Sequence, residues 1–318
     1  MAKKQKHNKS SKNSIAKRII KAITQAQKKK IINLEEIKKA KINAEILQKS
    51  ILTNEEMEGY DPLYAIYVYG QNNISLLIDQ IAQLPAASKL VSACINAEEE
   101  YMPSWPPASP LSTSYFTCWS AFDLAVGSPK ESFGKIAIKL CKHLKVDENL
   151  VKIYQILQES RNGIYIHCGV EGEFVILKEF ITNKTINAIT PSGYIGQKGE
   201  VWLARVLDTP LPYFNFAYSV VFTSPYVLGR TENGYWRNIG DQISIFSFLK
   251  RNINQMKIPN EADAYYHFMK YGVNRNYWNE YIFQGYANHN KNAIFLTGVP
   301  DMPSSLPHPH IIPVEINS

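Results

Sequence analysis

The spacing of apolar residues changes at Ile164 of this 318-residue chain. Before that point apolar side chains recur at three- and four-residue intervals, as on one face of an amphipathic helix. After it come short runs rich in β-branched and aromatic residues, such as Phe174–Ile181 and Thr185–Ile189, with a hairpin turn at Thr182–Lys184 between them. The helical spacing returns after residue 240. The sequence therefore predicts an α+β protein with a helical domain, a small sheet and a C-terminal helical layer.

The same pattern divides the chain into four expected segments. Residues 1–58 form a basic arm, disordered at first and helical from Ser14, and residues 59–163 form a helical domain. Residues 164–230 carry four or five short strands, which favours a small antiparallel barrel or strongly twisted sheet. Residues 231–318 return to helix, with one strand and a Pro-rich tail.

Positive charge is concentrated at the start of the chain. Residues 1–50 hold 15 Lys or Arg and 3 Glu, whereas the other 268 residues hold 20 basic and 25 acidic side chains. Such an arm favours a polyanion, either nucleic acid or an anionic membrane face, although a purely solubilising extension is the alternative. The expected phosphate-binding residues are Lys3, Lys4, Lys6, Lys9, Lys12, Lys17, Arg18, Lys21, Lys28, Lys29 and Lys30. The favoured function is non-catalytic association with RNA or DNA through phosphate neutralisation.

Compartment and cofactor use follow from what the sequence contains. No apolar run approaches the roughly 18 residues that span a bilayer, and no secretory signal is expected, so a cytoplasmic location is predicted. Cys94, Cys118, Cys141 and Cys168 are widely spaced within apolar runs, which indicates free thiols in a reducing compartment. No metal site and no cofactor are expected.

The motifs of common enzyme classes are absent from the sequence. It has no Walker loop, no G-x-G-x-x-G, no H-E-x-x-H and no G-x-S-x-G. The alternative to a binding protein is a hydrolase-type enzyme with a pocket between the barrel and the C-terminal helices. Its candidate catalytic residues are Asp123, His167, His267, Glu280, His289 and Asp301.

Asp123 is the most informative of these candidates, because it interrupts an otherwise apolar helix. A buried carboxylate is costly unless a cation or donor pairs with it, and Lys135 or Arg161 would be its partner. A structural ion pair is the favoured interpretation of Asp123. His167 precedes Cys168 directly, and neighbouring side chains of a strand point to opposite faces, so the two residues do not form a dyad.

Two further patterns concern partners. The Pro-rich segments Pro103–Pro110 and Pro300–Pro313 would dock other proteins if the chain is an adaptor, a second alternative function. A compact barrel with aromatic side chains on its face often binds strands of nucleic acid. The candidate stacking rings are Tyr194, Trp202, Tyr213, Phe214 and Phe216.

Overall fold

The computed structural model describes residues 14–29, 56–101, 110–209, 216–232, 235–237, 250, 253–254 and 256–271. The chain forms two compact units. The helical unit comprises Met1–Ala93 and Ala125–Glu159, and the barrel unit comprises Cys94–Leu124 and Ser160–Ser318. The α+β class expected from the sequence is confirmed.

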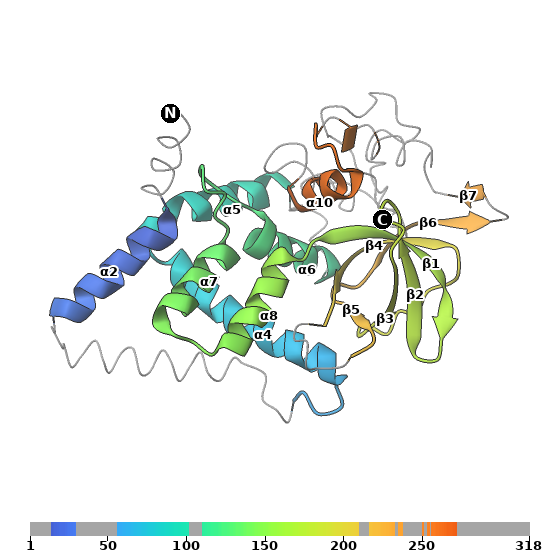
Figure 1. Cartoon of the computed structure of the whole chain (residues 1–318), viewed down its shortest axis with the longest axis horizontal. Helices are drawn as coiled ribbons and strands as arrows, with labels where there is room; N and C mark the ends of the chain where they lie inside the picture. Colours follow the sequence, from blue (N-terminus) through green and yellow to red (C-terminus); the bar gives the residue numbers. More distant parts are fainter. Residues whose placement is uncertain are drawn as a thin grey trace, which may run out of the picture. The chain divides into compact units, whose positions relative to one another are not determined.

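The helical unit is built from α2 (Ile15–Lys29), α4 (Pro62–Ala82), the 3-10 turn η1 (Pro85–Ala87), the first half of α5 (Ser88–Tyr101), α7 (Phe133–Leu144) and α8 (Glu148–Glu159). Helix α4 packs on both α7 and α8, and α2 packs on α7 (Figure 1). The helices bury one apolar stripe each, as their spacing predicts, and the fully buried side chains include Leu63, Ile74, Leu90, Ile136 and Leu157.

Side-chain caps set where these helices begin. Asp61 accepts hydrogen bonds from the backbone N–H groups of Leu63 (2.8 Å) and Tyr64 (3.0 Å), and Pro62 occupies the first turn of α4. The sequence pattern suggested a helix only from Asn73, so α4 begins eleven residues earlier than expected. Asp61 and Pro62 therefore start α4, whereas the sequence pattern predicted only that they end the basic arm. Asp147 caps α8 as its position predicts.

Gly70 on α4 allows a close approach of α8. A Cβ at this position would lie 2.4 Å from Cγ2 of Ile153, which is far inside van der Waals contact. We expect Gly70→Ala to destabilise the protein, because overpacking costs about 1–3 kcal/mol and exceeds the gain of up to about 1 kcal/mol in helix propensity. Urea unfolding measures the change. The double variant Gly70→Ala/Ile153→Ala should lose less than the sum of the single variants, and additive losses would contradict the contact.

The barrel unit contains β1 (Asn162–Glu171), β2 (Phe174–Glu179), β3 (Thr185–Ile189), β4 (Glu200–Leu207), β5 (Ser219–Val221), β6 (Tyr226–Glu232) and β7 (Tyr235–Arg237). Their order is β1-β2-β3-β5-β4-β6-β7, and β1 also pairs with β4, which closes five strands into a barrel. The β6–β7 hairpin continues from β4 beyond the closed barrel (Figure 1).

Two details distinguish this barrel from the expected antiparallel sheet. Strands β3 and β5 pair in parallel, at Ala188 with Ser219 and at Ile189 with Val220. Strand β1 pairs with β4 over Asn162–Ile166 and with β2 from Tyr165 onward, and its pairing with β2 has a register shift between His167 and Gly169. The barrel interior holds Tyr165, Val175, Leu177, Ala188, Trp202, Ala204 and Val221.

Helical segments cover the barrel. These are α6 (Pro110–Cys118), the π-helical turn η2 (Trp119–Asp123) and α10 (Glu261–Tyr271). The Tyr115 hydroxyl donates to the Leu203 carbonyl (2.7 Å), and the Ile164 N–H donates to the Tyr265 hydroxyl (2.9 Å). These bonds attach α6 to β4 and α10 to β1.

Candidate functional site

Asp123 lies in a buried cluster of charges in the barrel unit. Its carboxylate accepts from Lys270 Nζ (2.6 Å) and, by a short contact, from Arg205 Nη2. All three side chains are at most 1% exposed. Burial alone would lower the pKa of Arg205, but the adjacent Asp123 outweighs it and the pKa is raised. The Ser160 carbonyl accepts from both cations, so the cluster joins η2, β4, α10 and the residue that leads into β1.

The partners predicted for Asp123, Lys135 and Arg161, are wrong. Lys135 belongs to the helical unit and donates to the Lys130 carbonyl, and Arg161 pairs with Glu179 at 2.8 Å. The true partners follow Asp123 by 82 and 147 residues, a separation that local patterns do not bridge. One signal was present, since Arg205 interrupts the apolar strand β4 just as Asp123 interrupts its helix. The Asp123 carboxylate is thus enclosed by two cations in a buried ion-pair cluster.

The histidine candidates do not form a catalytic group with Asp123. His167 is buried, its Nε2 lies 2.9 Å from the Ile195 carbonyl, and its ring meets the edge of Trp202. Burial lowers its pKa, so the ring is neutral at pH 7. His267 is half-buried on α10 between Tyr266 and Tyr271. No hydrogen bond joins any two of Asp123, His167 and His267, which all lie within the described chain. Glu280, His289 and Asp301 lie outside the described residues.

Two of the five candidate stacking rings, Trp202 and Tyr194, bind Glu200 of the barrel. Trp202 is fully buried and donates from Nε1 to Glu200 (2.9 Å), so it offers no face to a ligand. The Tyr194 hydroxyl donates to the same carboxylate. Phe216 is half-buried and packs on Tyr218. Tyr213 and Phe214 lie outside the described residues, as do both Pro-rich segments apart from Pro110.

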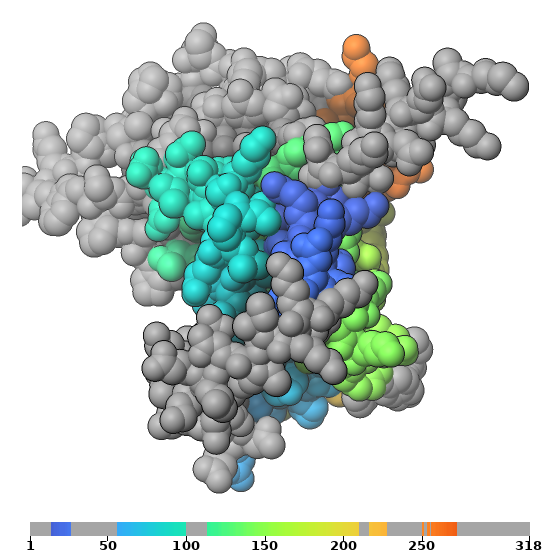
Figure 2. Space-filling view, turned by 90° about the vertical axis from the view of Figure 1, so that its left-hand side faces the viewer, coloured from blue at the N-terminus to red at the C-terminus, as the bar shows by residue number. Residues whose placement is uncertain are grey.

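The basic arm is partly built into the helical unit. Ile15, Ala16 and Ile19 of α2 are buried, and Thr24 Oγ1 lies 3.4 Å from His143 Nε2 at the end of α7. Lys17, Arg18 and Lys21 are exposed on the opposite side of α2. Figure 2 shows this helix in blue at the molecular surface. Lys28 and Lys29 end the helix. Lys3, Lys4, Lys6, Lys9, Lys12 and Lys30 lie outside the described residues.

Helix α7 adds a second row of cations beside α2. Residues 14–29 and 130–145 together carry ten Lys or Arg and one Glu. We call six of the exposed members the α2–α7 basic surface: Lys17, Arg18, Lys21, Lys139, Lys142 and Lys145. Among the described residues, no carboxylate lies within ion-pair distance of Lys17, Lys21, Lys142 or Lys145. The contribution of α7 was not evident from the sequence, because the chain beyond residue 50 is net acidic as a whole.

The single carboxylate of this region holds α2 in place. Glu131 is buried and accepts from Ser14 Oγ (2.7 Å), the Ile15 N–H (2.6 Å) and Lys139 Nζ (2.9 Å). Burial alone would raise its pKa, but these hydrogen bonds outweigh burial and the pKa is lowered. Glu131 therefore acts as an ionised cap that binds the first turn of α2 to the segment preceding α7.

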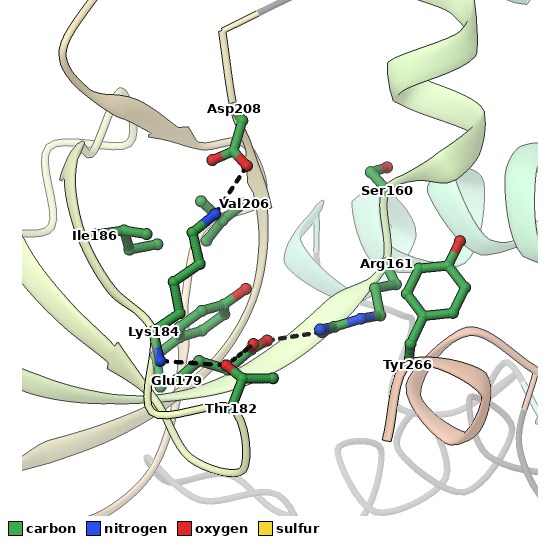
Figure 3. A pocket seen from close by; sticks show the side chains of 10 residues that line it. Ser160, Arg161, Glu179, Thr182, Lys184, Ile186, Val206, Asp208 and Tyr266 are labelled. Atoms are coloured by element: carbon green, nitrogen blue, oxygen red, sulfur yellow. Dashed lines mark hydrogen bonds and ion pairs between the residues drawn. The ribbon is translucent and has the colours of Figure 1, made fainter. Parts of the chain in front are cut away.

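A cavity of about 330 Å3 opens at one end of the barrel (Figure 3). We call it the barrel mouth. Tyr165, Ile186 and Val206 line it from β1, β3 and β4, and Tyr266 lines it from α10. Polar side chains surround it, and they are Ser160, Arg161, Glu179, Thr182, Lys184 and Asp208.

Comparison with known proteins gives no family for this chain. No family model matches the sequence, no curated protein matches it, and no solved structure matches the fold. In the described part of the chain, no helix is both long and apolar enough to cross a membrane. The same residues contain no group of three His, Cys, Asp or Glu side chains placed to hold a metal ion. All four cysteines are free thiols in the structure.

Proposed function

We propose that the protein associates with RNA or DNA, without catalysis, through the α2–α7 basic surface. One observation carries the proposal: two contacting helices with their flanking residues, 14–29 and 130–145, carry ten cationic residues, and the single carboxylate among them, Glu131, is buried. Such like charges repel each other, and a phosphate backbone relieves that repulsion and releases counterions. The contacts go to phosphates, so little sequence preference is expected.

Nucleic acid is favoured over an anionic membrane by the way α2 is packed. A helix that lies in a membrane interface inserts its apolar face among the headgroups. In this protein Ile15, Ala16 and Ile19 are buried in the helical unit, so this apolar face of α2 packs against the protein and is not available to a membrane. What remains exposed near the start of α2 is polar and cationic, which suits a phosphate backbone.

The test replaces surface lysines and leaves the core intact. Deleting residues 1–50 would remove Ile15 and Ile19 from the core, so a loss of binding by that truncation would be ambiguous. The variant Lys17→Gln/Lys21→Gln/Lys142→Gln keeps the packing of α2 and α7. Its matched control is Lys152→Gln/Lys178→Gln/Lys198→Gln, which removes the same charge at other sites.

Fluorescence anisotropy with a labelled 20-nucleotide RNA and a 20-base-pair DNA, over a salt series, measures the outcome. We expect the triple variant to bind at least about 10-fold more weakly at low salt, with a salt slope reduced by roughly two to three because three phosphate contacts are lost. The control should bind like the unmodified protein. Equal affinity of both variants, or no binding by the unmodified protein at 50 mM salt, would refute the proposal, and binding to anionic vesicles alone would point to a membrane.

A further inference from the structure

The geometry points to the barrel mouth as a binding site for a single uncharged nucleoside, with the base inserted toward the barrel core. This inference does not depend on the α2–α7 basic surface. It rests on the shape of the cavity, on the pairing of the charges around it and on the flat groups that form one of its walls.

The floor of the barrel mouth is the open end of the barrel core. Tyr165 belongs to that core, and Ile186 and Val206 pack against it. The Tyr165 ring folds back along β1, where a Cβ on Gly163 would lie 2.5 Å from the tyrosine hydroxyl oxygen, so glycine at 163 makes room for the ring. The mouths of β-barrels are frequent ligand sites, and about 330 Å3 is at the small end of their usual volumes. The cavity therefore suits one small molecule with an apolar body.

The charges around the cavity are already neutralised. Arg161 pairs with Glu179 at 2.8 Å, and Lys184 pairs with Asp208 at 3.1 Å. Thr182 Oγ1 donates to Glu179 (2.5 Å), and Ser219 Oγ donates to Asp208 (2.7 Å). A free anion or cation would have to displace a partner of opposite charge. A neutral ligand with donors and acceptors along its edge can add hydrogen bonds to both pairs without breaking them.

One wall of the barrel mouth carries a guanidinium group and an aromatic ring. The Arg161 guanidinium lies over the rings of Tyr265 and Tyr266, at 4.8 and 5.6 Å from their centroids. In Figure 3, Arg161 and Tyr266 lie on one side of the cavity, and Ile186, Val206 and the alkyl stem of Lys184 lie on the other. Guanidinium and aromatic planes are the groups on which unstacked bases rest in proteins.

A nucleobase meets all three conditions. It is planar, it is neutral, and its edge alternates hydrogen-bond donors and acceptors. Glu179 and Asp208 can accept from an exocyclic amino group, and Lys184 can donate to ring nitrogens or carbonyl oxygens. The site would bind the base of one nucleotide and make no specific contact with its phosphate.

Ligand-observed saturation-transfer NMR on the full chain, with adenosine, guanosine, cytidine and uridine, tests this inference. We expect at least one nucleoside to bind, with an affinity that is unchanged between 50 and 500 mM salt because the ligand carries no charge. Ile186→Phe, which fills the cavity, and Tyr266→Ala, which removes part of its wall, should each weaken binding at least 10-fold. Asp208→Asn changes an exposed rim residue and should reduce affinity while the protein stays folded.

The matched control is Lys178→Ala, compared with Lys184→Ala, because Lys178 does not line the cavity. Absence of transfer from all four nucleosides at millimolar concentration would overturn the inference, as would binding that Ile186→Phe and Asp208→Asn both leave unchanged. A salt-dependent affinity for nucleoside monophosphates without any for nucleosides would also overturn it. A failure of this inference can be distinguished from a failure of the proposed function. The α2–α7 test uses a polyanion as ligand, and its lysine variants lie on elements that do not line the barrel mouth.

Discussion

Replacement of Asp123 by alanine is expected to lower the free energy of unfolding by about 3–5 kcal/mol, because it leaves Arg205 and Lys270 as unpaired buried cations. Asp123 accepts hydrogen bonds from both side chains, and all three are almost completely excluded from water. The expected loss is a large part of the roughly 5–15 kcal/mol that stabilises a typical domain. Urea unfolding, followed by tryptophan fluorescence of Trp119 and Trp202, measures it.

The matched control is Asp208→Asn, which removes a carboxylate from an ion pair at the surface. Lys184 and Asp208 are 60% and 63% exposed, and such pairs contribute at most about 1 kcal/mol. A similar loss in both variants would show that the Asp123 cluster is hydrated in solution. A second test replaces the whole cluster, as Asp123→Leu/Arg205→Met/Lys270→Met. This variant should recover part of the stability lost in Asp123→Ala, because no charge remains without a partner.

Local patterns predicted those parts of the fold that depend on neighbouring residues. The period of apolar residues predicted α2, α7 and α8, the cap at Asp147 and the turn between β2 and β3, because these features need no information beyond about one turn of chain. Strand β4 has the bounds predicted for it from the sequence, Glu200–Leu207. The start of α4 was missed, since its first turn is marked by Asp61 and Pro62 and lacks a strong apolar stripe.

A small barrel was among the expected sheets, but its closure by particular strand pairs could not be predicted in this way. It depends on β1 pairing with β4, and on two parallel pairs between β3 and β5, whose partners are about 30 residues apart. The β6–β7 hairpin was also missed. Pairing across such distances is decided by the total burial of all strands, so no single segment carries the signal.

The candidate sites, like the fold, could be predicted where neighbouring residues carry the signal and were missed where distant segments meet. Sequence alone identified Asp123 as a residue that needs a partner, and the structure shows the cluster, but Arg205 and Lys270 come from elements that only the tertiary fold brings together. The barrel mouth had no sequence signal, since its lining comes from four strands and a helix and each residue is ordinary in its own segment. The basic arm was evident from composition, whereas its extension onto α7 became visible only when α2 and α7 proved to be neighbours.

Replacement of Glu131 is the second change with a large expected effect, because Glu131 holds α2 on the helical unit. Glu131→Ala removes the acceptor for Ser14 Oγ and the Ile15 N–H, both in a buried environment. Leaving these donors unsatisfied should cost about 2–4 kcal/mol in all, since each buried unpaired group costs about 1–3 kcal/mol. Limited trypsin digestion detects undocking as faster cleavage after Lys17, Arg18 and Lys21. Lys139→Gln is the matched control, because Lys139 is half-exposed and its removal should change the cleavage rate little.

The same carboxylate makes the docking of α2 dependent on pH. The pKa of Glu131 in the folded protein is lowered from its usual value of 4.5, so its stabilising effect is complete above that value and is lost as the pH falls through the folded-state pKa. The difference in unfolding free energy between the unmodified protein and Glu131→Gln should therefore be largest near pH 7 and shrink below pH 4.5. A difference that stays constant from pH 7 to pH 3 would mean that Glu131 holds α2 by packing alone. A difference that disappears on acidification would establish its ionised carboxylate as the cap that keeps the basic helix on the helical unit.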